Sequence, residues 1–314
     1  KYVEQSCSSC HQGVVDVPKA DNLNRGVHLV KTLGCYGCHK IQGYEDLRKV
    51  GPDLRRVKAK LDGEWMEKWI RDPRGFRATT KMPKVFDLQN VNSPEDRAIS
   101  TAAIHGIAKY LLAHSEDLSY PDPPVSGDVA RGEDLVEKTG CRACHVVGEG
   151  DDLGQEYGLR NFGPSLNDVG TKMNAGWLYA WVKNPEAYFS ETMMPNLRLT
   201  DQEAADITAY LLTLRNRDFE SRTPASVDIK VRDDLALEFL KARMPVVAAQ
   251  DSLASMSSEA KDLFVGERMI LRQGCYGCHQ IEGFEDATPI GTELTLQGSK
   301  DVAKLDFALN PLNI

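Results

Sequence analysis

The chain lacks three features that would each indicate a particular class of protein. It has no run close to the roughly 18 consecutive apolar residues that a membrane-spanning helix needs. It has no excess of positive charge, because 38 Lys and Arg stand against 46 Asp and Glu, which argues against nucleic acid as a partner. It has no cysteine outside four short motifs, which excludes a small disulfide scaffold dense in cysteine. With 41% hydrophobic residues in 314, the chain can still form ordinary apolar cores.

All eight cysteines belong to four copies of the pattern Cys-x-x-Cys-His. This pattern is typical of covalent haem c attachment, in which both thiols form thioethers to the porphyrin edge and the adjacent histidine binds iron. We therefore expect four covalently bound haem c groups. The predicted attachment residues are Cys7, Cys10, Cys35, Cys38, Cys141, Cys144, Cys275 and Cys278, and the predicted proximal iron ligands are His11, His39, His145 and His279.

Zinc binding and redox disulfides explain the cysteines less well. Structural zinc usually takes two Cys-x-x-Cys pairs about 15–20 residues apart. Here the intervals are long and unequal, and zinc leaves the histidine of every copy unexplained. A thioredoxin-like site needs a strand before the motif, and no alternating pattern leads into any copy. Because a histidine follows the second cysteine in every copy, we favour haem attachment over zinc binding and redox disulfides.

Three of the motifs are embedded in similar surroundings, which indicates an internal repeat. A short amphipathic helix precedes each of them and ends at a glycine: Gly34, Gly140 and Gly274. A Gly-x-x-Leu segment follows each motif: Gly51-Pro52-Asp53-Leu54, Gly163-Pro164-Ser165-Leu166 and Gly291-Thr292-Glu293-Leu294. The first and third lie at the same offset from their first cysteine, whereas the second follows an insertion at 148–160.

Two of the repeats continue into further predicted helices. A helix with two tryptophans spans 64–70 in one and 176–182 in the other, and each stops at a proline. A Met-Pro pair follows in each repeat, at Met82 and at Met194. Closing helices run from a cap at Ser93 to about residue 114, and from a capping box at Thr200 to about residue 214.

This order of parts resembles class I cytochrome c over residues 22–115 and 126–216, and over half a module from 257. The resemblance implies a mainly α fold of tandem class I cytochrome c-like helical modules around covalent haems, with little or no β-sheet. By this likeness Met82 completes the iron bound by His39, and Met194, rather than Met193, completes the iron bound by His145. The carbonyls of Pro52 and Pro164 would then accept the outer ring N–H of those two histidines.

The repeats also predict how the chain is divided. We expect an N-terminal haem-binding segment at 1–21, modules at 22–120 and 121–222, a linker at 223–256 with a helix near 231–243, and a third module at 257–314. No methionine follows Met269, so we expect that module to be cut before its sixth ligand. For the haem at Cys7 the predicted sixth ligand is His28, with His105, His114 or a ligand from upstream or from a partner as alternatives.

These features predict an electron carrier with no catalytic residues: a multihaem c-type cytochrome of a respiratory chain. Haem c is attached outside the cytoplasm, so we expect a periplasmic or other extracytoplasmic location, with an export signal removed or lying outside this chain. The expected partners are redox proteins, with electrons passing from a quinol-oxidising membrane complex to an oxidase, a reductase or an external acceptor. Two alternatives stay open: a peroxidase- or reductase-like enzyme with one open iron, and a structural subunit of a larger cytochrome complex or filament.

Overall fold

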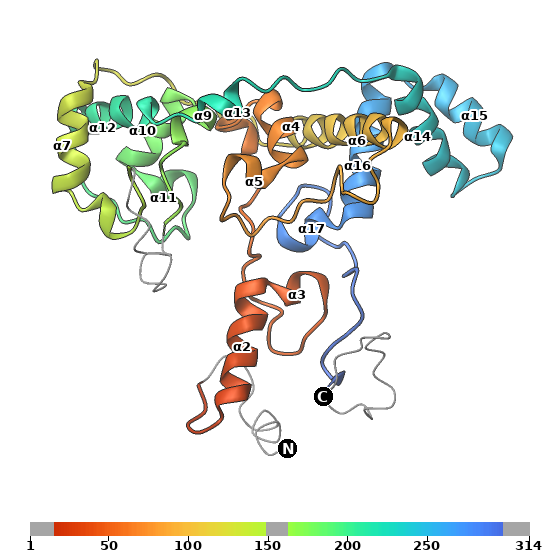
Figure 1. Ribbon diagram of the computed structural model, residues 1–314, viewed down its shortest axis with the longest axis horizontal. Helices are drawn as coiled ribbons and strands as arrows, with labels where there is room; N and C mark the ends of the chain where they lie inside the picture. The colour runs from red at the N-terminus through yellow and green to blue at the C-terminus, as the bar shows by residue number, and fades with distance from the viewer. Residues whose placement is uncertain (1–15, 149–162, 298–314) are drawn as a thin grey trace. The chain divides into compact units, whose positions relative to one another are not determined.

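The computed structural model describes residues 16–148 and 163–297 of the chain (Figure 1). The described residues are helical and contain no β-sheet, only an isolated bridge between Leu88 and Val91. The expected mainly α fold is therefore confirmed. Among these residues no helix is both long enough and apolar enough to cross a membrane. The first haem motif, Cys7, Cys10 and His11, and most of the insertion at 148–160 lie outside the described residues.

The chain divides into two compact units. The first, here called the terminal unit, combines Lys1–Leu54 with Ile270–Ile314, and the second, the central unit, is Arg55–Met269. The motifs at Cys35 and Cys275, far apart in sequence, thus belong to the same unit. The module boundaries expected from the sequence stay a prediction.

Short helices carry the two described haem motifs of the terminal unit. Helix α2 (Asp21–Leu33) leads into α3 (Cys35–Cys38), and the end of α16 (Ser258–Gln273) leads into α17 (Cys275–Cys278). Gly34 and Gly274 separate the members of each pair with φ angles of 69° and 67°. Glycine adopts this left-handed conformation without the steric cost that a side chain adds, so the predicted glycine stops are confirmed.

The central unit begins with the tryptophan-bearing segment expected from the sequence. Its elements are η1 (Val57–Ala59), α4 (Gly63–Arg71), α5 (Pro73–Phe76) and α6 (Pro94–Ala113). Asp62 caps α4 by accepting a hydrogen bond from the backbone N–H of Trp65. Ser93 and Asp96 form a capping box at the start of α6. Both helices therefore begin where the sequence predicted.

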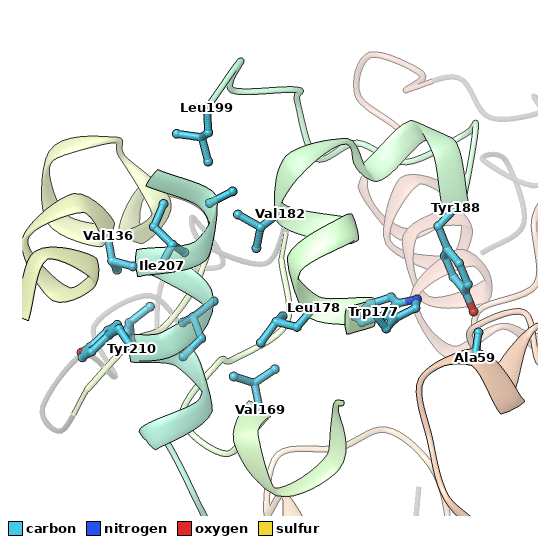
Figure 2. Packing of buried hydrophobic residues seen from close by; sticks show 13 residues of the cluster. Ala59, Val136, Val169, Trp177, Leu178, Val182, Tyr188, Leu199, Ile207 and Tyr210 are labelled. Atoms are coloured by element: carbon cyan, nitrogen blue, oxygen red, sulfur yellow. The ribbon is translucent and has the colours of Figure 1, made fainter. Parts of the chain in front are cut away.

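A second bundle follows with the same order of parts. It contains α7 (Val129–Lys138), η2 (Cys141–Ala143), α9 (Val169–Lys172), α10 (Ala175–Lys183), α11 (Pro185–Tyr188), α12 (Asp201–Thr213) and α13 (Arg217–Glu220). Val136 of α7, Leu178 of α10 and Ile207 of α12 are each at most 3% exposed and lie in one apolar core (Figure 2). This core holds η2 and its haem motif next to a rigid helical scaffold.

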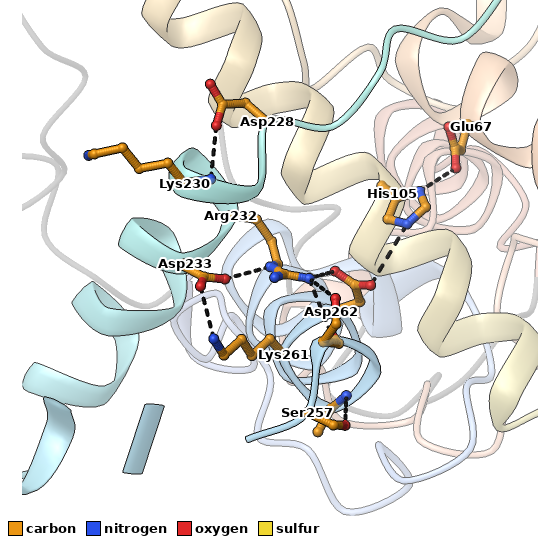
Figure 3. A network of polar contacts seen from close by, with 11 residues as sticks. Glu67, His105, Asp228, Lys230, Arg232, Asp233, Ser257, Lys261 and Asp262 are labelled. Carbon is orange, nitrogen blue, oxygen red and sulfur yellow. Dashed lines mark hydrogen bonds and ion pairs between the residues drawn. The ribbon is translucent and has the colours of Figure 1, made fainter. Parts of the chain in front are cut away.

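Residues 223–256 contain more helix than the sequence predicted. The expected helix is α14 (Ile229–Lys241), and a second helix, α15 (Val246–Ser255), follows it. Arg232 of α14 is 4% exposed and is held by Asp262 at 2.8 Å and by Asp233 at 2.7 Å (Figure 3). A buried arginine needs such partners. The sequence missed α15 because exposed Val246 and Val247 break the apolar periodicity that marks a helix.

Helix α16 packs against α6 through a pair of glycines. A Cβ added to Gly266 would lie 2.1 Å from the carbonyl oxygen of Gly106. In the other bundle, a Cβ added to Gly132 of α7 would lie 2.0 Å from the carbonyl oxygen of Asp206 in α12. Both crossings bring the helix backbones together at a position that only glycine fits. Helix α16, which precedes the motif at Cys275, therefore packs against α6 in the same way as α7 packs against α12.

Candidate haem-attachment sites

The motif at Cys141 is closed by a loop of its own repeat. The backbone N–H of His145 donates to the carbonyl of Cys141 at 2.9 Å, which fixes the turn. The Nδ1–H of His145 donates to the carbonyl oxygen of Pro164 at 2.7 Å, so the predicted role of Pro164 is confirmed. This contact sets the tautomer and orientation of the ring and leaves Nε2 for iron.

A glycine lies directly against the histidine ring in this site. A Cβ added to Gly163 would lie 2.4 Å from Cε1 of His145, closer than any ordinary packing contact. Gly163 and Leu166 also tie the loop to the motif, because their N–H groups donate to the carbonyls of Cys144 and Val146 at 3.1 and 2.9 Å. We call this arrangement the histidine clasp: a glycine against the ring, the next residue's carbonyl accepting from Nδ1–H, and a leucine whose N–H donates to the chain after the motif.

In the terminal unit the two histidine clasps are exchanged: the histidine of each motif is held by the loop that follows the other motif. The Nδ1–H of His39 donates to the carbonyl oxygen of Thr292 at 2.8 Å, and that of His279 donates to the carbonyl oxygen of Pro52 at 2.9 Å. The prediction that Pro52 holds His39 is therefore wrong. Thr292 replaces proline without loss, because the carbonyl and not the side chain makes the contact.

Backbone hydrogen bonds repeat the exchange on both sides. The N–H groups of Gly51 and Leu54 donate to the carbonyls of Cys278 and Gln280 at 2.8 and 2.9 Å. The mirror-image bonds run from Gly291 to Cys38 at 2.7 Å and from Leu294 to Lys40 at 2.9 Å. Every bond of the clasp at His145 has a counterpart here. The two chain segments satisfy their backbone groups as fully as a segment folded on its own motif would.

The glycines of the exchanged clasps have the same contact as Gly163. A Cβ on Gly51 would lie 2.5 Å from Cε1 of His279, and one on Gly291 would lie 2.4 Å from Cε1 of His39. Glycine at this position is thus a packing requirement of the site. The sequence showed these three glycines, but it did not show which histidine each one covers.

The two Met-Pro loops have matching local structure. The N–H of Met82 donates to Oγ1 of Thr80 at 3.2 Å, and that of Met194 donates to Oγ1 of Thr192 at 3.1 Å. Met193 is 73% exposed, which favours Met194 as the ligand residue. The indole N–H of Trp69 donates to Sδ of Met82 at 2.9 Å. Both methionines stay predicted sixth ligands.

The three histidines outside the motifs have different surroundings. The Nδ1–H of His105 donates to Glu67 at 2.8 Å, and its Nε2 lies 4.0 Å from Asp262 (Figure 3). The Nδ1–H of His114 donates to the carbonyl of Tyr110 at 3.0 Å, and its imidazole stacks on the phenol ring of Tyr110. His28 is exposed on α2 with Nε2 3.3 Å from Oγ1 of Thr32. His28 as a ligand to the first haem stays a prediction.

Burial controls the protonation of the site at Cys275. It raises the pKa of the Cys275 thiol to about 11. It also raises the pKa of Cys278, with neighbouring Cys38 adding to the effect. Burial lowers the pKa of His279, and the contact with Pro52 only partly opposes this. The imidazole is therefore held neutral, the form that ligates a metal.

One cationic side chain contacts the clasp loop of His145. Arg77 donates from Nη2 to the carbonyl of Ser165 at 2.9 Å. Burial lowers the pKa of Arg77 and raises that of Asp168. Burial and the charges of Arg77 and Lys60 lower the pKa of Lys172 to about 7. Positive charge next to an iron centre favours its reduced state.

The donors present fit haem better than a bare metal ion. None of the six described cysteines forms a disulfide. Across residues 16–148 and 163–297, no group of three or more His, Cys, Asp or Glu side chains could hold a metal ion. The indole nitrogens of Trp65 and Trp177 are buried and have no hydrogen-bond partner among the described residues. Such donors suit the carboxylates of a porphyrin, and large apolar side chains left exposed in the terminal unit suit its faces: Leu29, Leu33, Val50, Ile290 and Leu296.

Comparison with known proteins identifies one part of the chain. The family model described as cytochrome c matches residues 129–215. Residues 129–215 are a cytochrome c domain. This domain runs from α7 through α12 and includes the motif Cys141–His145 and Met194. The chain matches no curated protein and no solved structure. Outside the domain, the cysteine pairs at 35/38 and 275/278 indicate further haem sites.

Proposed function

We propose that the chain is a multihaem c-type cytochrome that binds four haems and carries electrons without transforming a substrate. The observation that supports this best is that one histidine clasp occurs three times, at His39, His145 and His279, although only His145 lies in the matched domain. A protein that repeats the same ring orientation at each Cys-x-x-Cys-His motif is built to hold the same group at each.

The residues of each site have separate roles in holding the haem. Paired thiols tether the group, the adjacent histidine supplies Nε2, and the clasp carbonyl fixes the ring through Nδ1. Bound haem supplies iron that cycles between its ferrous and ferric states, with potentials set by axial ligands, hydrogen bonds and burial. A methionine from a Met-Pro loop would keep water and substrates off the iron. The fourth haem, at Cys7, Cys10 and His11, belongs to the proposal on its motif alone.

The proposed location is the periplasm or another extracytoplasmic face of a membrane. Covalent haem attachment takes place there, and this supports the proposal. The proposed partners are redox proteins on either side of the transfer: a quinol-oxidising membrane complex as donor and an oxidase, reductase or external acceptor downstream. A net charge of −8 favours partners with basic docking surfaces.

Mass spectrometry of the exported protein tests the proposal. We expect a mass that exceeds the polypeptide by four haems and visible spectra that switch reversibly between oxidised and reduced forms. The low-spin spectrum of a six-coordinate iron should dominate in both forms. A mass equal to the bare polypeptide would refute haem attachment. A high-spin ferric band with cyanide or peroxide binding would instead support the enzyme with an open iron.

A further inference from the structure

The two described haem motifs of the terminal unit, at Cys35 and at Cys275, are packed against each other through glycine. A Cβ added to Gly37 would lie 2.1 Å from the carbonyl oxygen of Gly277. One added to Gly277 would lie 2.9 Å from the carbonyl oxygen of Gly37 and 3.1 Å from Sγ of Cys38. The backbones of α3 and α17 therefore touch, with no side chain between them. An attachment sulfur of one motif lies at the surface of the other.

The third motif shows that attachment itself does not require this glycine. In the motif of the cytochrome c domain the same position is Ala143, whose side chain is exposed. Gly37 and Gly277 are thus required by the contact between the two motifs. The two motifs also match in their local structure. The hydroxyls of Tyr36 and Tyr276 each donate to a carbonyl 12 residues further along, at 2.7 and 2.9 Å.

The exchanged histidine clasps join the same two motifs a second time. His39 is oriented by the loop of the Cys275 repeat, and His279 by the loop of the Cys35 repeat. The ammonium of Lys49 adds bonds to the carbonyls of Tyr276 at 2.6 Å and His279 at 3.3 Å. Neither motif can shift without moving the ring orientation of the other. The pair behaves as one structural element.

We propose that the haems attached at Cys35/Cys38 and at Cys275/Cys278 form one coupled pair, which exchanges electrons directly and in which reduction of one haem hinders reduction of the other. This rests on the proposed function, because both groups must be attached. In the exchange one iron gives up an electron and the other takes it up, and no bond forms or breaks. The second reduction is harder because the electron already added repels the next one across a short, poorly solvated distance.

Circular dichroism in the Soret region tests whether the two groups are neighbours. Two haems held close together give a signal with paired positive and negative lobes. We expect this signal to vanish in Cys35→Ser/Cys38→Ser and equally in Cys275→Ser/Cys278→Ser. The matched control Cys141→Ser/Cys144→Ser, which removes a haem from the central unit, should retain it. In a potentiometric titration we expect the first reduction of the pair to weaken the second by about fivefold or more.

Glycine variants test the contact itself. Gly37→Ala places a methyl group against the Gly277 carbonyl, so we expect the paired Soret signal to weaken while the haem content by mass stays unchanged. Ala143→Val adds bulk at the equivalent exposed position, and we expect it to leave the signal as it is. If Gly37→Ala fails to fold, the Cys→Ser double variants still test whether the two haems are neighbours. A paired signal that survives loss of either terminal-unit haem overturns the coupled pair, whereas a protein without attached haem overturns the proposed function instead.

Discussion

Substitution of Gly51 by alanine tests the exchange of the histidine clasps. The added Cβ would lie 2.5 Å from Cε1 of His279, whereas ordinary contacts begin near 3.4 Å. The loop must therefore move by about 0.9 Å, the difference between these two distances. The Pro52–His279 hydrogen bond starts at 2.9 Å, so this movement takes it past the usual limit for such a bond.

The expected effect is a higher reduction potential for the haem at Cys275. A carbonyl that accepts from Nδ1–H makes the imidazole a stronger donor to iron and so favours the ferric state. Loss of a hydrogen bond with a net value of about 1 kcal/mol corresponds to about 40 mV for a one-electron couple, since a tenfold change equals about 59 mV. The potential should rise by that order.

Deletion backgrounds show which haem responds. With Cys275→Ser/Cys278→Ser the affected haem is absent, so Gly51→Ala should leave the remaining potentials unchanged. With Cys35→Ser/Cys38→Ser the rise should persist. Gly163→Ala is the matched control and should raise only the potential of the haem at Cys141. If the shift instead disappears with the Cys35 haem, each loop closes on its own motif and the exchange described here is wrong.

Further predictions concern the sixth ligands and the charged groups of the central unit. Met194→Ala should leave haem attached at Cys141 but abolish the Met–iron absorption band of that centre and lower its potential; an unchanged spectrum would contradict the assignment. Met82→Ala tests the other predicted ligand in the same way, and the centre expected to respond is the iron bound by His39. The Arg131 guanidinium lowers the pKa of Asp206 to about 2. This depressed pKa stabilises the fold above about pH 4, and the gain is lost as the pH falls through about 2. In urea titrations Asp206→Asn should therefore cost about 1–2 kcal/mol near neutral pH, discounted for the exposure of Arg131, and much less at about pH 2. Lys172 has a folded pKa of about 7, below its ordinary value. Its charged form therefore destabilises the fold fully below pH 7 and progressively less toward pH 10. In thermal melts Lys172→Met should raise the melting temperature at about pH 6 and change it little at about pH 10.

Local features of the fold could be predicted from the sequence because their causes are local. The boundaries of α4, α6, α10 and α12 follow from caps and prolines within a few residues of each end. The glycine stops before the three described motifs follow from one left-handed residue each. The contact of His145 with Pro164 was predicted from the resemblance to class I cytochrome c, and here the motif and the loop do lie in one repeat.

Features that depend on distant residues could not be predicted in this way. Burial of Arg232 needs the carboxylate of Asp262, which stands on another helix. Gly106 lies within α6, and only the crossing with Gly266 shows why a side chain is excluded there. Periodicity reports which face of a helix is apolar, but it does not identify the partner helix.

The sequence by itself determined how many motifs the chain has, the residues of each motif and the segments that form a clasp. Only the tertiary structure decided which clasp closes on which histidine. The physical reason is that residues 35–54 and 275–294 have the same spacing and their bonds run through backbone groups. A loop folded on its own motif and a loop exchanged with its counterpart make the same hydrogen bonds, so the local sequence does not distinguish them. In the structure Gly37 lies against Gly277, and this contact keeps the two motifs close enough for each loop to reach the histidine of the other.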